Sequence, residues 1–218
     1  ELAESKGIRL VHLFEDEWIE KRDIVEKKIA VICGIREQRI YARKTKVVDA
    51  DASSVREFYD QNHIQGHVPS SKTYSLSYDG KIVASMSFKR KNRSTSEWEL
   101  TRFATSCNVV GGFSKLLARF KKENEWSSII SFADRRWSQG DVYIKNGFVE
   151  VHRTPPNYYY VKDQKRIRKQ NYRRKYLPSK LHDFNPDLSE KENTEMNGLY
   201  RIYDCGLIKY QLNNSREK

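Results

Sequence analysis

The residues best suited to chemistry in this sequence follow a short apolar run. Asp134-Arg135-Arg136-Trp137 comes directly after Ser128–Ala133, a run that predicts a buried strand. Ligands collect at the carboxyl ends of strands in open α/β sheets. Arg135 and Arg136 could therefore pair with a phosphate, and Trp137 could stack on a ring. These three residues are predicted to contact nucleic acid.

A second candidate site precedes an amphipathic helix. Gly111-Gly112 comes before Phe113–Asn124, whose apolar residues recur at helical spacing. Backbone amides at a helix N-terminus bind phosphate groups, so Gly111, Gly112 and Ser114 could hold the pyrophosphate of an acyl-CoA. Two adjacent glycines before a helix are equally typical of a plain turn, so acyl-CoA is not the favoured cofactor.

Acyl transfer would also need a general base, and the sequence offers three candidates. Glu99 lies in a predicted strand, Asp134 ends another, and His63 lies in a polar, glycine-flanked loop. Glu99 and Asp134 could instead pair with neighbouring arginines, and the loop around His63 could satisfy only its own backbone. No catalytic residue is assigned from these three.

The strongest feature for nucleic-acid binding is a basic segment after residue 160. The chain has 41 Lys and Arg against 29 Asp and Glu, a formal net charge of +12, which favours a polyanionic partner. Basic side chains interleaved with tyrosines suit contact with a phosphate backbone, and they predict duplex DNA as the partner. The alternative is a solvated amphipathic helix. The basic residues predicted to bind are Lys165, Arg166, Arg168, Lys169, Arg173, Arg174 and Lys175.

The elements that must position these residues alternate between strands and helices. From Val47 the pattern predicts strand, helix, three strands, helix, strand, helix and strand, with a tight hairpin turn at Asp79-Gly80. This order implies an α/β fold with a mixed sheet and helices on both faces. Ahead of it, Ile8–Phe14 is predicted to be a short strand, and Glu15-Asp16-Glu17 opens a helix favourably because acidic groups suit its positive end.

Several classes of protein are disfavoured. The three cysteines are widely spaced, which argues against a zinc site or a disulfide framework and favours a reducing, intracellular location. No apolar run is long enough for a membrane span. Glu15, Asp16 and Glu17 are better explained by helix capping than by metal binding, so no metal site is predicted.

Residues 46–162 resemble the GNAT acyltransferase superfamily, and the last part of this region is similar to phage DNA-modification proteins of the Mom type. The resemblance implies a GNAT-like domain that binds acyl-CoA, although the chain lacks the fuller Gln/Arg-x-x-Gly-x-Gly/Ala motif. The segments that carry it are Asp79-Gly80, Glu97–Phe103, Val110-Gly111-Gly112, Ser131–Asp134 and Tyr143–Phe148.

The whole chain also resembles Hef-like phage homing endonucleases, in which a Vsr-like nuclease precedes such a domain. This resemblance implies that residues 1–33 end a nuclease fold, 34–45 form a basic connector, and 163–218 form a basic segment and tail. It implies a divalent metal for the intact nuclease, whose ligands lie upstream of the segment seen here. The segments that carry it are Lys6–Trp18, Tyr41–Lys44, Asn62–Gly66, Asp134–Ser138, Pro156–Tyr158 and Tyr200–Gly206.

Three functions follow from these observations. The first is the DNA-targeting part of a homing endonuclease in a phage-infected bacterium, which is not expected to cut DNA by itself. The second is a GNAT- or Mom-like acyltransferase acting on a nucleobase or an amine. The third is a non-catalytic nucleic-acid-binding remnant. Neither the target site nor the oligomeric state follows from the sequence.

Overall fold

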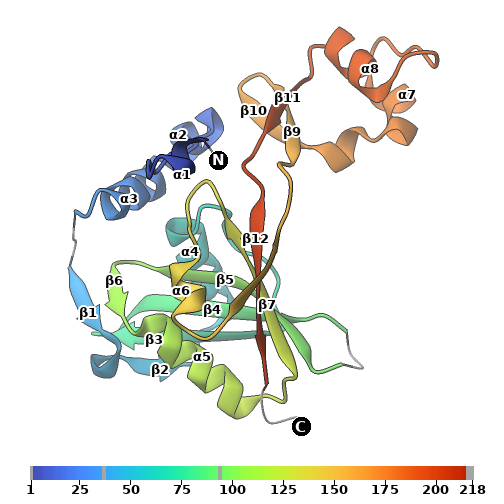
Figure 1. Cartoon of the computed structure of the whole chain (residues 1–218). Helices are drawn as coiled ribbons and strands as arrows, with labels where there is room; N and C mark the ends of the chain where they lie inside the picture. Colours follow the sequence, from blue (N-terminus) through green and yellow to red (C-terminus); the bar gives the residue numbers. More distant parts are fainter. Residues whose placement is uncertain (1, 36–37, 93–94, 215–218) are drawn as a thin grey trace.

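The computed structural model describes residues 2–35, 38–92 and 95–214, and its central feature is a seven-stranded mixed sheet (Figure 1). The strand order is β2-β3-β4-β5-β7-β12-β8, and β5–β7 is its one parallel pair. The strands are β2 (Lys46–Val48), β3 (Lys72–Tyr78), β4 (Lys81–Arg90), β5 (Glu97–Thr105), β7 (Ser128–Asp134), β8 (Val149–Arg153) and β12 (Leu207–Asn213).

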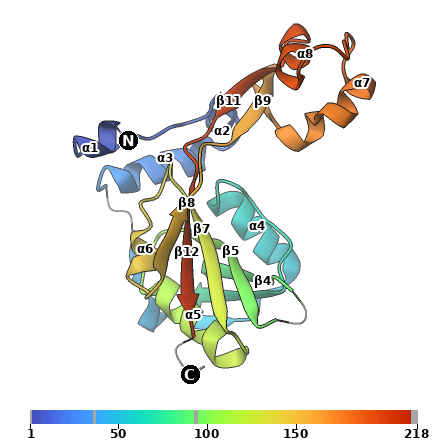
Figure 2. The ribbon, with the colours of Figure 1, turned by 45° about the vertical axis from the view of Figure 1, so that its right-hand side comes forward.

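Helices cover both faces of this sheet, as Figure 2 shows. In β4, Met86 and Phe88 pack in the core beneath α5 (Gly112–Glu123). Side chains alternate between the two faces of a strand, so Ser87 points to the opposite face. There its hydroxyl lies 2.8 Å from the hydroxyl of Tyr59 on α4 (Ala52–Asn62). The predicted α/β fold with a mixed sheet and helices on both faces is confirmed.

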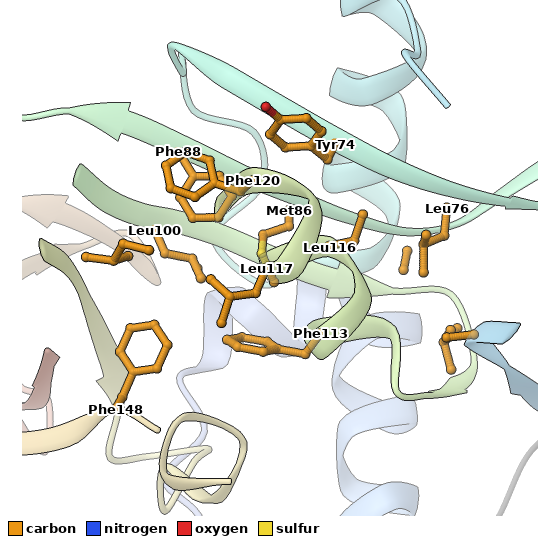
Figure 3. Close-up of a cluster of buried hydrophobic side chains, with 14 of the residues drawn as sticks. Tyr74, Leu76, Met86, Phe88, Leu100, Phe113, Leu116, Leu117, Phe120 and Phe148 are labelled. Atoms are coloured by element: carbon orange, nitrogen blue, oxygen red, sulfur yellow. The ribbon is translucent and has the colours of Figure 1, made fainter. Parts of the chain in front are cut away.

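The main core lies between the sheet and α5 (Figure 3). Phe120 of α5 stacks on Phe88 with ring centroids 3.7 Å apart, and Leu116 is fully buried beside Met86. Fully buried apolar side chains of this size each contribute about 1.5–3 kcal/mol of stability. This core fixes α5, and therefore its N-terminus, against β3 and β4.

The chain before the sheet forms three helices and a short strand. These elements are α1 (Leu2–Ser5), α2 (Glu15–Glu20), α3 (Arg22–Ile32), β1 (Arg39–Tyr41) and the 3-10 turn η1 (Ala42–Lys44). The predicted strand over Ile8–Phe14 is wrong. This segment joins no sheet, and Ile8 and Leu10 are 57% and 56% exposed because no layer of structure covers them. β1 pairs in parallel with β6 (Asn108–Val110), just before α5.

An excursion between β8 and β12 forms a small second unit that projects from the sheet (Figures 1 and 2). It holds a three-stranded sheet of order β10-β9-β11 around a core of Tyr160, Leu177, Leu181 and Leu199. Its elements are β9 (Tyr158–Lys162), β10 (Lys165–Arg168), η2 (Lys169–Tyr172), η3 (Arg174–Tyr176), α7 (Leu177–Lys180), α8 (Glu190–Met196) and β11 (Tyr200–Tyr203). β12 then returns to the main sheet, which therefore extends beyond residue 162.

Buried ion pairs join the N-terminal helices to both units. Arg136, which is 5% exposed, donates to Glu17 at 2.9 Å and to Asp134 at 2.7 Å. Arg166 of β10 donates to Asp16 at 2.8 Å and to Glu17 at 3.0 Å. Both guanidinium groups also lie over the ring of Phe14, and we call this cluster the ion-pair joint. It holds α2, and through it α3, against the end of β7.

Candidate active site

The parallel strands β5 and β7 pair only near their starts and then separate. A register shift in the β4–β5 ladder between Ser87 and Phe88 marks a bulge, which bends a strand locally. Within the described residues, both strands continue beyond their shared ladder and leave a fork between them. The three pairs of that ladder are Glu97–Ser128, Trp98–Ile129 and Glu99–Ile130.

Three polar groups meet at the base of the fork. The hydroxyl of Ser131 lies 2.9 Å from the carbonyl oxygen of Leu100 and 3.0 Å from the hydroxyl of Tyr143. Tyr143 belongs to α6 (Asp141–Ile144) and stacks on Tyr210 with ring centroids 4.9 Å apart. Burial raises the pKa of Tyr143, so its hydroxyl keeps its proton at neutral pH.

One edge of β5 faces into the fork with its backbone groups. The amide of Ser106 donates to the carbonyl of Val83, which places the backbone groups of Ser106 on the β4 side. Backbone groups alternate sides along a strand, so those of Phe103 and Thr105 point away from β4. Both residues line the cavity described next. An extended ligand with amide groups could pair with this edge.

A cavity of about 830 Å³ fills the open end of the fork, within the range of about 300–1,000 Å³ typical of small-molecule sites. Its lining comes from both faces of the sheet. His63 and Asn62 come from the end of α4, Phe113 and Ser114 from the start of α5, and Lys28 from α3. The cavity therefore connects the α4 face to the α5 face through the fork.

The N-terminus of α5 forms the α5-face end of this cavity. Gly111 has a left-handed φ of 78°, which turns the chain sharply into the helix. A Cβ atom on Gly112 would lie 3.0 Å from Cγ1 of Val109, so this position leaves little room for a side chain. The first-turn amides have no partner within an α-helix and are free to bind an anion. The Ser114 hydroxyl donates to Asn146 at 2.7 Å, which ties this end to the segment after α6.

The charge of the cavity lining is entirely positive. Among its described residues are Arg9, Lys27, Lys28 and Lys145, and no Asp or Glu. Lys28 contacts the Trp137 ring, with its Nζ 5.6 Å from the ring centroid. Burial lowers the pKa of Lys28, with smaller opposing effects from Asp134 and Glu17. An anionic ligand would relieve this unfavourable burial of charge.

His63 is neutral in the folded protein and is not arranged to act as a base. Burial, together with the positive charges of Arg102, Lys28 and Lys21, lowers its pKa to about 3. Its Nδ1 accepts a hydrogen bond from the amide of Gln65 at 3.1 Å. The proton of the neutral ring therefore resides on Nε2, so His63 can donate a hydrogen bond.

The other two candidate bases do not face the cavity. Both oxygens of Asp134 accept hydrogen bonds from Arg136, which leaves this carboxylate engaged in the ion-pair joint. Glu99 forms part of the β5–β7 ladder and is absent from the described lining of the cavity. A catalytic role for Glu99, Asp134 or His63 stays a prediction.

The predicted nucleic-acid residues lie in three places. Trp137 lines the large cavity and, with Arg135, also a second pocket of about 420 Å³. Arg136 and Arg166 are held in the ion-pair joint. Their role in binding duplex DNA stays a prediction. The remaining predicted residues lie on β10, on the two 3-10 turns after it and, for Arg173, between these turns. They are Lys165, Arg168, Lys169, Arg173, Arg174 and Lys175.

Sequence reasoning did not single out Lys28, which lines the cavity, or Tyr143, whose hydroxyl lies beside Ser131 at the base of the fork. Lys28 follows Ile24 by four positions and therefore shares the inward face of α3, a spacing that could have identified it. Tyr143 lies in the segment Tyr143–Phe148 that carries the GNAT resemblance, but its position at the fork depends on how α6 packs. Lys28 belongs to no sequence motif.

No metal site is found in the described part of the chain, where no group of three His, Cys, Asp or Glu could hold an ion. Asp16 and Glu17 accept hydrogen bonds from Arg166 and Arg136. No helix among residues 2–35, 38–92 and 95–214 is long and apolar enough to cross a membrane. The predicted intracellular location goes beyond this finding and stays a prediction.

Comparisons with known proteins match acetyltransferase structures at low sequence identity. A Bacillus subtilis acetyltransferase in complex with CoA is 11% identical, with a TM-score of 0.45, covering 78% of this chain and 98% of its own. The ribosomal-protein-S18-alanine N-acetyltransferase from Escherichia coli is 12% identical, with a TM-score of 0.47, and the match covers 78% of this chain and 93% of that protein. A GNAT-family acetyltransferase from Elizabethkingia anophelis with acetyl-CoA bound is 10% identical, with a TM-score of 0.43, covering 78% and 99%.

No family model and no curated protein matches the chain. The structures similar over most of the chain are acetyltransferases. In view of them, the predicted relation to Hef-like homing endonucleases is wrong, and so is the function of positioning a nuclease on DNA. The physical reason lies in the N-terminal segment, where the strand needed to end a Vsr-like nuclease fold does not form. The predicted endonuclease, hydrolase and DNA-binding classes find no support.

Proposed function

We propose that the chain is an acyltransferase that moves an acyl group from an acyl-CoA to an amine, which includes the amino group of a nucleobase. The observation that carries this proposal is the cavity that passes through the β5–β7 fork. It has the N-terminus of α5 at one end and residues from the end of α4 at the other. Two substrates could thus meet at the fork from opposite sides of the sheet.

The residues on the α5 face fit the donor. The first-turn amides of α5, with Lys145 beside them in the lining, would hold the pyrophosphate. The free backbone edge at Phe103 and Thr105 would pair with the amide groups of the pantetheine arm. An acyl-CoA supplies an activated acyl group in the form of a thioester.

The absence of the fuller glycine motif has a structural counterpart. The segment before α5 forms β6, whose backbone pairs with β1. Lys115 of α5 donates to the carbonyl of Ala42 at 2.8 Å and so holds the same neighbouring segment in place. The binding of phosphate groups is thereby left to the first turn of α5 and to cationic side chains. We expect a weaker affinity for CoA than a longer amide-rich loop would give.

The chemistry at the fork follows from two protonation states. Attack by the amine would form the amide C–N bond and break the thioester C–S bond. Tyr143, which retains its proton at the base of the fork, would give that proton to the leaving thiolate and take one back from the acylated nitrogen. No carboxylate is among the described lining residues, and the proton of neutral His63 is on Nε2. The acceptor amine therefore has to reach the fork uncharged. The rate of transfer should rise with pH until it passes the amine's own pKa.

Calorimetric titration of the full chain with CoA tests this proposal directly. Saturable binding is expected, and Ser114→Asp should weaken it by about tenfold because its carboxylate repels the phosphates. The same substitution should stabilise the unliganded protein by about 0.3–1 kcal/mol, since an acidic group suits the start of a helix. Ser114→Ala is the matched control and should bind CoA much as the unaltered chain does. Absence of any saturable heat with CoA would overturn the proposal.

A further inference from the structure

The α4-face end of the cavity differs from the α5-face end in how it would bind a ligand. Its polar groups are side chains rather than backbone amides, and they come from α3, the end of α4 and the turn after β7. We propose that this end binds an anionic group, a phosphate or a carboxylate, carried by the acceptor, with Lys28 as its counter-ion and His63 and Trp137 beside it. The inference rests on the proposed transferase function and names its acceptor class.

Lys28 has no counter-ion in the described part of the chain. The carboxylates that influence it electrostatically, Asp134 and Glu17, are both bound by arginines of the ion-pair joint. A partly buried ammonium group without a partner is unfavourable, and burial lowers the pKa of Lys28 for this reason. An anion bound beside Lys28 would stabilise its charged form as the partner of an ion pair that is partly shielded from water.

The electrostatic potential around His63, at the same end of the cavity, is positive. Arg102, Lys28 and Lys21 all act to lower its pKa. The side chain therefore stays neutral and donates from Nε2, as an oxygen ligand requires. No acidic group appears among the influences on His63. An anion at this position would be attracted by three cations, and the carboxylates that act on Lys28, Asp134 and Glu17, are already paired with Arg136.

Trp137 adds a second independent observation. Its side chain lies beneath Lys28, it is 7% exposed, and its indole N–H has no acceptor among the described residues. Buried donors are nearly always paired in folded proteins. The surrounding cluster of Ile24, Val25, Ile64 and Trp137 is apolar and limits access by water. Small movements of Lys28 toward a ligand would allow an anion to satisfy both donors.

The alternative is that these cations bind a phosphate of CoA itself. Blocking the α5-face end separates the two cases. Desulfo-CoA, which cannot transfer an acyl group, would be added to saturation before the second ligand. Any anion that still binds at Lys28 then occupies a different subsite from that of the donor.

The test follows the indole N–H signal of Trp137 by NMR in the full chain, with the signal assigned from Trp137→Phe. Inorganic phosphate and acetate are titrated separately into the complex with desulfo-CoA, so that the two sources of negative charge are distinguished. We expect a saturable shift with at least one of them. Lys28→Met, which keeps the length of the side chain and removes its charge, should weaken this binding about tenfold or more. Lys122→Met, in the last turn of α5 and outside the described lining of the cavity, is the matched control and should leave it unchanged.

The outcomes test the acceptor inference and the transferase proposal separately. If desulfo-CoA binds and neither anion gives a saturable shift, the acceptor inference fails and the transferase proposal stands. An unchanged response in Lys28→Met also overturns the inference. If desulfo-CoA does not bind but phosphate does, the transferase proposal fails and a simple anion site remains. Failure of both ligands removes both proposals.

Discussion

The two walls of the cavity are held in place by different forces. The sheet wall rests on a large apolar core, in which Phe120 stacks on Phe88 and Leu116 is fully buried. The α3 wall has a small apolar cluster of four buried residues and depends on the ion-pair joint of Glu17 and Arg136. Apolar packing is nondirectional, whereas buried ion pairs are stable only while every partner stays in place.

This difference indicates which wall can move. Proteins open locally where few apolar contacts hold an element, at a free energy below that of global unfolding. α3 meets this description, and it covers the end of the cavity where Lys28 lies. We therefore expect substrates to enter by displacement of α3, while the fork and the start of α5 stay fixed. The predictions below test this contrast.

The largest effect should come from the sheet wall. Phe120→Ala removes a fully buried ring and should lower the free energy of unfolding by about 3–5 kcal/mol. Because the core spans the sheet, hydrogen exchange should accelerate throughout β3, β4, β5 and α5. Urea unfolding measures the energy, and native-state exchange maps its location. Acceleration confined to α5 alone would contradict a single cooperative core.

The counterpart on the other wall is Arg136→Met. It should lower the free energy of unfolding by about 3 kcal/mol, which is the lower end of the range for breaking a buried ion pair. The loss stays at this end because Arg166 still pairs with Glu17. Exchange should accelerate in α2 and α3 and stay slow in β4. Equal acceleration in the sheet would show that the two walls are not separate. CoA binding should survive, since the start of α5 is untouched.

The pH dependence of stability should reveal His63 on the α3 side of the cavity. Its folded pKa of about 3 lies below the ordinary value of 6.5, so the unfolded chain binds more protons between these values. Stability therefore rises with pH across this window and is lost as pH falls from 6.5 toward 3. His63→Gln should reduce the change in unfolding free energy across this pH window by about 2 kcal/mol. This is less than the full pKa shift would give, because the side chain is partly solvated. Unfolding at a series of pH values in both proteins gives the comparison.

The sheet wall was largely predictable from sequence, and the α3 wall was not. The hairpin at Asp79-Gly80 follows from local chemistry, and both residues have the positive φ that such a turn requires. The helical spacing before Asn124 likewise placed α5 correctly. In contrast, the bond between Glu17 and Arg136 joins residues 119 positions apart. Pairing at that separation leaves no periodic signal in the sequence.

The errors have physical causes of the same kind. The pattern predicts one last strand over residues 149–161, interrupted at Pro155-Pro156. The structure has two strands there, β8 and β9, which belong to different sheets because proline cannot donate to a ladder. The apolar spacing from Trp18 to Ile29 predicts that the helix opening at Glu15 is continuous, but it breaks at Lys21, whose ψ of 35° is not helical. The alternative of an amphipathic helix for the basic segment gives way to the β9–β10 hairpin, since Tyr160 on β9 is needed in the core of the small unit.

The smallest expected effects come from exposed ion pairs, and they should be the same on both walls. Arg22 pairs with Glu26 on α3, and Arg119 pairs with Glu123 on α5, each one helical turn apart and largely solvated. Replacement of either arginine by alanine should lower the free energy of unfolding by only about 0.3–0.5 kcal/mol, because solvent and salt screen such pairs. Both losses should shrink further in high salt. A markedly larger loss for Arg22→Ala would mean that α3 is held by its surface charges as well as by the ion-pair joint, and the contrast between the walls would then rest on more than buried residues.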